Sequence, residues 1–154
     1  MKKTLQLCMI LSTLFVACQK ENVVTTDVKT TKELLIEKKW YLKAILITPS
    51  FMGMSNLYDS LIPCQKDDII TYRSSGKKEV DNGILKCYAS NPQIDSATLW
   101  KLQNTKLITT LDIGSQILRD TFNIELIDNK NLNLGISFKY GKDMYKYLYK
   151  YESK

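Results

Sequence analysis

The stretch CQKDDIITY, residues 64–72, together with the pair KC at residues 86–87, decides how this sequence folds. Residues 67–73 are rich in β-branched and aromatic side chains and end at Ser74-Ser75-Gly76, which predicts a strand followed by a turn. The part played by the two flanking cysteines depends on what happens to the other cysteines of the chain, Cys8 and Cys18.

The first 17 residues have the pattern of an export signal rather than of folded structure. Lys2 and Lys3 precede an apolar run, residues 4–16, that is short for a membrane span and ends at Ala17-Cys18. A small residue directly before a cysteine resembles the cleavage site of bacterial lipoprotein signal peptides. The resemblance implies that residues 1–17 are removed and that Cys18 is lipidated; the alternative is an ordinary secretory signal with an incidental cysteine.

That resemblance leaves two cysteines for the folded part of the chain. Cys8 lies in the removed segment and Cys18 carries the lipid, so Cys64 and Cys87 remain in a chain exported to an oxidising compartment. We therefore expect one disulfide that holds the strand of residues 67–73 to a neighbouring strand and contributes about 3 kcal/mol. Two isolated cysteines without histidine do not predict a zinc site.

The segment that follows Cys18 is polar and has no apolar periodicity, so residues 18–30 are expected to tether the lipid to the domain. Gln19-Lys20-Glu21 also resembles the surface-display signal of Bacteroidetes lipoproteins, with one acidic residue present. The expected location is the bacterial outer membrane. Its periplasmic face and the cell surface both stay open.

The charge balance excludes one class of partner. The full chain has 22 basic and 16 acidic residues, and removal of Lys2 and Lys3 leaves 20 against 16, a net charge of +4. The lysines are spread along the chain, without the arginine-rich or basic and aromatic clusters that bind nucleic acid. We expect a solvated surface, no nucleic-acid partner, and one monomeric domain.

One short helix and then many short strands are expected between residues 31 and 154. Thr30 and Glu33 have capping-box spacing, which predicts a helix at about residues 31–38. A strand then begins at Trp40, with Leu42, Ala44 and Leu46 on one face, and Pro49 is expected to end it. Further strands are predicted at residues 67–73, 78–80, 84–88, 97–103, 106–112, 122–126, 132–138 and 144–151.

Two features of this strand pattern have open interpretations. Residues 50–63 form a long, apolar connection, which is typical of a lid or binding loop but equally of a cap over one end of the core. The last strand places Tyr145, Tyr147, Tyr149 and Tyr151 on one face. These tyrosines would line a cavity or cover the outside of the domain.

The pattern as a whole fits a closed barrel or a sandwich of antiparallel strands. Over residues 31–154 it resembles the lipocalin-like domain of Bacteroidetes lipoproteins. The matching elements are Leu35 through Trp40, Cys64-x-x-Asp67-Asp68-x-x-x-Tyr72, Gly76, Cys87, Trp100 with Leu102, and the pair Phe122-x-Ile124 and Leu132-x-Leu134. The resemblance implies an all-β fold, an up-and-down antiparallel eight-stranded barrel with a short N-terminal helix and often an internal cavity. Lys38-Lys39-Trp40 replaces the Gly-x-Trp of lipocalins.

Catalytic chemistry has few candidate residues. The sequence contains no histidine, which excludes histidine-based triads, acid–base pairs and metal sites. Asp67 and Asp68 are adjacent, so on a strand they point to opposite faces. We interpret one of them as a turn cap or a backbone contact beside the disulfide, and we expect no enzyme activity, cofactor or metal.

Two functions remain. The first is a membrane-anchored barrel that binds a small, largely apolar molecule, with Trp40, Tyr72 and residues 51–62 near the mouth or floor of its cavity. The second is a cell-envelope interaction or structural protein with a filled barrel and a protein or glycan partner. The candidate ligand-binding residues are Trp40, Phe51, Met54, Tyr72, Trp100, Tyr145, Tyr147 and Tyr149.

Overall fold

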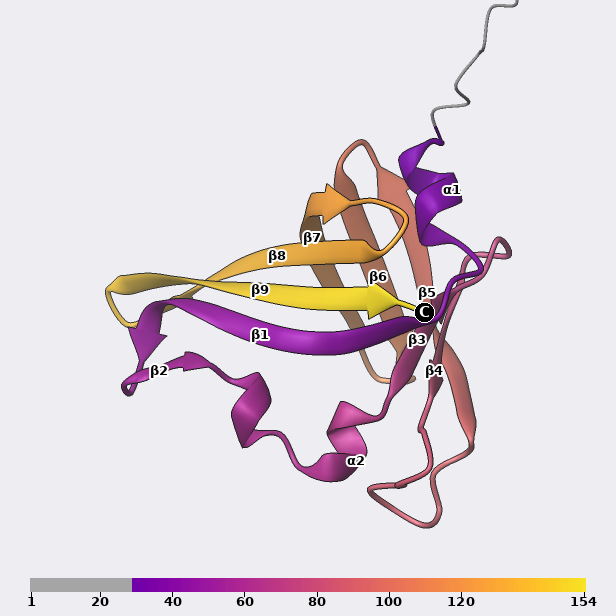
Figure 1. Ribbon diagram of the computed structural model, residues 1–154, viewed down its shortest axis with the longest axis horizontal. Coiled ribbons are helices and arrows are strands. Elements are labelled where there is room, and N and C mark those ends of the chain that lie inside the picture. The colour runs from indigo at the N-terminus through magenta and orange to yellow at the C-terminus, as the bar shows by residue number, and fades with distance from the viewer. Residues whose placement is uncertain (1–28) are drawn as a thin grey trace, which may run out of the picture.

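The structure is a computed structural model in which residues 29–154 are described, and they form a closed antiparallel barrel (Figure 1). The strand order is β2-β1-β3-β4-β5-β6-β7-β8-β9, and β1 also pairs with β9. Eight strands, β1 and β3 to β9, therefore make the wall, and β2 is an additional strand on β1. The predicted all-β, up-and-down, eight-stranded barrel is confirmed.

The elements follow one another in this order: α1 (Thr31–Leu35), β1 (Trp40–Phe51), β2 (Met54–Asn56), η1 (Tyr58–Ser60), α2 (Pro63–Lys66), β3 (Ile69–Tyr72), β4 (Lys77–Asp81), β5 (Ile94–Gln103), β6 (Lys106–Asp112), β7 (Ile117–Ile127), β8 (Asn131–Tyr140) and β9 (Asp143–Ser153).

Helix α1 begins at the predicted capping box. The Thr30 side chain accepts a hydrogen bond from the Glu33 backbone N–H at 3.3 Å, and Glu33 accepts one from the Thr30 N–H at 2.7 Å. The helix ends at Leu35 instead of residue 38, because the chain turns there to meet β3. Ile36 forms a parallel bridge to Tyr72, and Glu37 has a positive φ of 57°.

The sequence pattern predicted that Pro49 would end β1, but the strand continues to Phe51. The last residue of β1 paired with β9 is Thr48, which lies opposite Lys146. The missing N–H of Pro49 therefore removes no hydrogen bond from the barrel wall. Residues 50–63 are not a plain loop either, since they include β2 and the short helix η1.

The predicted strand at residues 84–88 is wrong. Residues 82–93 form an irregular loop between β4 and β5, because several of their backbone N–H groups are bonded within the loop or to Asp67 instead of to a neighbouring strand. The Asn82 N–H donates to the Gln93 carbonyl at 2.9 Å, and the N–H groups of Ile84 and Leu85 donate to Asp67. Strand β3 is also shorter than predicted, at Ile69–Tyr72.

The expected disulfide between Cys64 and Cys87 is present, with a distance of 5.2 Å between the two Cα atoms. The sequence led us to expect that this bond would join two strands, and it does not. Cys64 lies in helix α2 and Cys87 in the β4–β5 loop, so the bond connects a short helix to a loop outside the barrel wall.

The hydrophobic core fills the end of the barrel that α1 covers, which we call the α1 end. Trp40 and Leu35 have no exposed surface, and Trp40 donates its indole N–H to the Leu35 carbonyl at 3.0 Å. This bond fixes the helix to the first strand. The remaining core residues are Tyr72, Trp100, Leu107, Leu132 and Leu134.

Candidate functional site

The tyrosines of β9 face the interior of the barrel. Tyr149 lies opposite the buried Leu134 of β8, and the same register places Tyr151 opposite Leu132 and Tyr147 opposite Ile136. The Tyr149 ring contacts the Phe122 ring of β7, with 5.9 Å between their centroids. Because β7 and β9 are not neighbours in the sheet, this contact crosses the interior. The four tyrosines therefore line the inside, which decides the question that the sequence left open.

The barrel is filled at the α1 end, whereas at the other end inward-facing residues of β7 are exposed. Inward-facing side chains at the α1 end are buried, as with Trp40 at 0% and Tyr72 at 2% exposure. Leu118 of β7 lies opposite Leu111 on the same inward face as Phe122, yet 46% of its surface is exposed. Asp120, between them on this face, is exposed as well. Solvent thus reaches the interior from the end opposite α1, which we call the open end.

Aromatic side chains gather inside the open end. Phe51 of β1 makes edge contacts with Tyr140 at 5.6 Å and with Tyr145 at 5.5 Å between ring centroids. Phe138 of β8 stacks on Tyr145 and also contacts Tyr147 at 4.7 Å. The structure therefore brings together three of the candidate ligand-binding residues, Phe51, Tyr145 and Tyr147.

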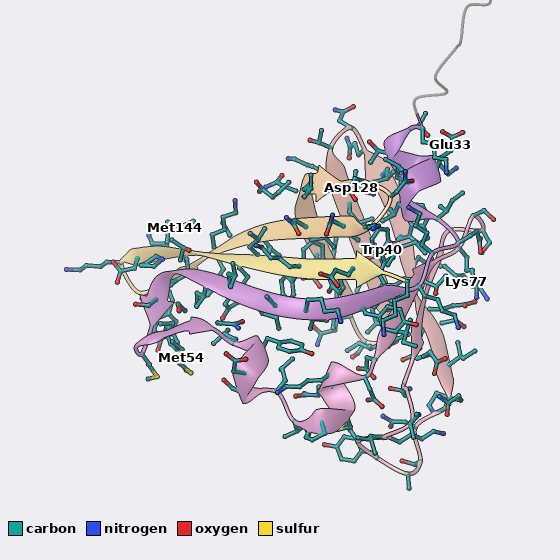
Figure 2. The ribbon with its side chains drawn as sticks, in the orientation of Figure 1. Glu33, Trp40, Met54, Lys77, Asp128 and Met144 are labelled. Atoms are coloured by element: carbon teal, nitrogen blue, oxygen red, sulfur yellow. A yellow bond between two sulfur atoms is a disulfide. The ribbon has the colours of Figure 1, made fainter. Side chains whose placement is uncertain are left out.

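Met54 lies at the margin of this aromatic group. It pairs with Phe51 across the β1–β2 turn, and 40% of its surface is exposed. Figure 2 places Met54 and Met144 at the extremity of the molecule that is far from Glu33 in α1. Met54 therefore belongs to the rim of the open end rather than to its interior.

Three candidate residues, Trp40, Tyr72 and Trp100, form the floor of the barrel. The rings of Tyr72 and Trp100 meet edge to face at 5.5 Å. The Trp100 indole N–H donates to the Arg73 carbonyl at 3.0 Å, and that of Trp40 is bonded to Leu35. Burial, with a smaller contribution from Tyr151, raises the pKa of Tyr72 well above its ordinary value. These three side chains pack against one another or against the core, and both indole N–H groups are bonded to backbone carbonyls.

Lys78 is an interior residue that the sequence reasoning missed. It lies opposite Tyr72 of β3 and Thr98 of β5, so it shares their inward face. Burial lowers the pKa of Lys78, and the carboxylates of Asp120 and Asp95 oppose that effect. Asp120 also contributes to the raised pKa of Tyr149, after burial and Tyr147. Asp120 is therefore near enough to influence the charge of both Lys78 and Tyr149, although it pairs with neither.

The connection from β2 to α2 runs beside β1 where β1 has no barrel neighbour on that side. Strands β1 and β3 pair only at Trp40–Ile70 and Tyr41–Ile69. Further along, the Leu57 N–H donates to the Ile45 carbonyl at 2.8 Å, and Asn56 accepts from the Ile45 N–H at 3.3 Å. Figure 1 shows η1 and α2 on this flank of the barrel. The segment completes the wall on the side where β3 is too short to do so.

Large apolar side chains are exposed on the loops of the open end. Ile84 of the β4–β5 loop is 95% exposed, and large apolar residues in or beside the other loops at this end are exposed too. The exposed set at this end comprises Met52, Met54, Ile62, Ile84, Leu85, Tyr88, Ile113, Ile117, Tyr140 and Met144.

The acidic pair has the role that we preferred from the sequence. Oδ2 of Asp67 accepts hydrogen bonds from the Ile84 and Leu85 N–H groups, both at 2.8 Å, beside the disulfide. Asp68 makes no such contact; its pKa is raised by burial and then by Asp67 and Asp81. Oδ1 of Asp68 is buried and has no hydrogen-bond partner among the described residues.

A hollow of about 250 Å³ lies at the α1 end, between α1, the β3–β4 turn and β5; it is lined by Lys32, Ser74, Gly76, Trp100, Lys101 and Leu102. Within residues 29–154, no three His, Cys, Asp or Glu side chains are grouped as metal ligands would be. None of the helices in that range has the length and apolar character needed to cross a membrane. The sequence matches no family model, no curated protein and no solved structure.

Proposed function

We propose that this chain is a membrane-anchored bacterial lipoprotein whose lipocalin-like barrel binds a small, largely apolar molecule. The observation that carries the ligand-binding part is the contrast within the barrel. Inward side chains are buried at the α1 end, whereas Leu118 and Asp120 are exposed on the same inward face further along β7. Tyrosine rings supply apolar walls with polar tips, as ligand pockets commonly do.

The membrane anchor rests on the sequence, because Cys18 and residues 1–28 lie outside the described part of the chain. Replacing Cys18 with serine is expected to leave the protein in the soluble fraction after cell lysis, because no lipid can be attached. Membrane attachment of this variant that persists after a high-salt wash would contradict the proposed anchor.

A second candidate function, docking of an envelope protein or glycan, has the exposed apolar loops of the open end in its favour. This alternative expects a barrel filled by its own side chains. The 46% exposure of the inward-facing Leu118 favours the ligand-binding function over it.

The decisive experiment is native mass spectrometry of residues 18–154 carrying Cys18→Ser, exported through a separate cleavable signal, followed by organic extraction of any bound compound. A reproducible adduct that is lost on unfolding is the expected result. The protein should also bind an apolar fluorescent probe that a small hydrocarbon displaces.

Two variants of β7 separate cavity binding from adhesion to the surface. Leu118→Arg puts a charge into the open half of the barrel, while Leu126→Arg puts the same charge on the outer face of the same strand. The two leucines are 46% and 44% exposed, so the substitutions should affect folding similarly. We expect loss of the adduct with Leu118→Arg and retention with Leu126→Arg. Equal retention in both variants would refute binding inside the barrel.

A further inference from the structure

Lys78 is placed unlike Lys77, the other lysine of strand β4. Lys77 lies opposite Leu99 on the outer face of the wall, and Figure 2 shows it directed away from the barrel. Lys78 lies opposite Tyr72 and Thr98, which face the interior. It is half-buried, at a level just above the aromatic floor formed by Tyr72 and Trp100.

The ammonium group of Lys78 has no close anionic partner among the described residues. The ion pairs within 4.0 Å in that part of the chain are those of Arg73 with Glu37 and Glu79, and of Lys146 with Glu125. Asp120 and Asp95 are near enough to favour its charged form, but neither pairs with it. A half-buried cation without a paired anion retains N–H donors that a ligand can use.

Lys78 and Thr98 form a polar region deep in the barrel, and the interior beyond them is largely apolar. Thr98 lies beside it on β5 and is followed on the inward face by Trp100 and by Thr109 of β6. Towards the open end, the interior is lined by Leu111, Leu118, Ile136, Phe138, Tyr145 and Tyr147. The arrangement matches a molecule with one polar head and an apolar body, the head lying deepest.

We infer that Lys78 binds the anionic head of an amphiphile, such as a long-chain carboxylic acid, whose hydrocarbon chain extends along the tyrosines towards the open end. This inference rests on the proposed function, because it requires the barrel to admit a ligand. The carboxylate of Asp120, which is exposed on the inward face of β7, would repel a second negative charge on the ligand. We therefore expect a head group with a single negative charge.

The inference is tested with dodecanoic acid and dodecanol as probes, which differ only in the charge of the head group. Dissociation constants are measured by probe displacement on residues 18–154 carrying Cys18→Ser. The unmodified barrel is expected to prefer the acid by roughly ten- to hundredfold, the range for a hydrogen bond to a charged group. In Lys78→Met this preference should disappear while the affinity for the alcohol is unchanged.

Three further variants keep the test independent of folding defects. Lys77→Met, one residue away on the outer face, should retain the preference. Lys78→Arg keeps the positive charge and should retain it too, even if Lys78→Met folds poorly. Asp120→Asn removes the opposing carboxylate and should strengthen acid binding without changing alcohol binding.

The outcomes distinguish failure of this inference from failure of the proposed function. Equal affinity for acid and alcohol in the unmodified protein would overturn the role of Lys78 but leave the cavity in place. An acid preference that survives in Lys78→Met would overturn it as well. Absence of binding for both probes would refute the proposed function and this inference with it.

Discussion

Removal of the disulfide, by Cys64→Ser with Cys87→Ser, is predicted to destabilise the protein without rearranging its core. The two cysteines are 23 residues apart in the sequence. In the chain-entropy model, a bond that closes a loop of this length removes about 11 cal/mol/K from the unfolded chain, so its loss costs about 3 kcal/mol at 25 °C. The bond joins α2 to the β4–β5 loop, and neither cysteine is buried. The entropic effect should therefore account for nearly all of the change.

Urea unfolding followed by tryptophan fluorescence measures this loss directly, because Trp40 and Trp100 both lie in the core. With a slope of about 2 kcal/mol/M, the midpoint should fall by about 1.5 M in the double variant. The unmodified protein unfolded in the presence of a reductant is the matched control and should share that midpoint.

Two results would refute the reasoning about the disulfide. A loss below about 1 kcal/mol would mean that the bond does not constrain the unfolded chain as the loop-closure argument requires. A loss above about 5 kcal/mol, or an altered near-ultraviolet circular dichroism spectrum of the folded state, would mean that the bond supports packing of the core, which its place outside the barrel excludes.

Three other substitutions probe single contacts. Trp40→Phe leaves the buried Leu35 carbonyl without its indole donor and should cost about 2–3 kcal/mol in urea unfolding; an unchanged midpoint would contradict the role of this bond. Asp68→Asn should raise the free energy of unfolding by about 1 kcal/mol at pH 7, because Oδ1 is buried without a described partner. Burial, Asp67 and Asp81 raise the pKa of Asp68 on folding, so the stability of the unmodified protein falls as pH rises from the unfolded-state pKa to the folded-state pKa of this group. The stability gained by Asp68→Asn should therefore vanish in acid, below both pKa values. A gain that persists there would refute the role assigned to the Asp68 carboxylate. Gly83→Ala should lower the melting temperature, because Gly83 has a φ of 61° and a Cβ would overlap the Asp67 carboxylate that holds the Ile84 and Leu85 N–H groups; an unchanged melting temperature would contradict that anchoring.

The elements that were predictable from the sequence are those whose causes are local. Strand β6 spans Lys106–Asp112, as its period of two predicted, and the turn before it contains Asn104 with a φ of 56°. The capping box of α1 is a contact between residues three apart. The errors have long-range causes. Residues 84–88 have the composition of a strand, but the carboxylate of Asp67, distant in the sequence, takes the N–H groups that a strand would need.

The candidate site was predictable in part for the same reason. Alternation places the four tyrosines of β9 on one face, but only pairing with β8 and closure through β1 show that this face is inside. Trp40, expected near the mouth or floor of a cavity, lies in the floor together with Trp100. Lys78 escaped notice because a lysine on a strand normally faces water, and its inward position follows from its register with Tyr72.

The order of residues along the inward face gives an independent reason to regard the open half of the barrel as functional. On β5 and β6, the buried Trp100 and Leu107 are followed towards the open end by the smaller Thr98 and Thr109. On β7, Phe122 is followed by Asp120, which lies opposite Thr109 of β6. A barrel stabilised only by its own packing would gain about 25 cal/mol for each Å² of apolar surface buried by continuing the bulky residues through the interior. The change to small and polar side chains on these adjacent strands forgoes that gain, and Thr98, one of these residues, lies opposite Lys78.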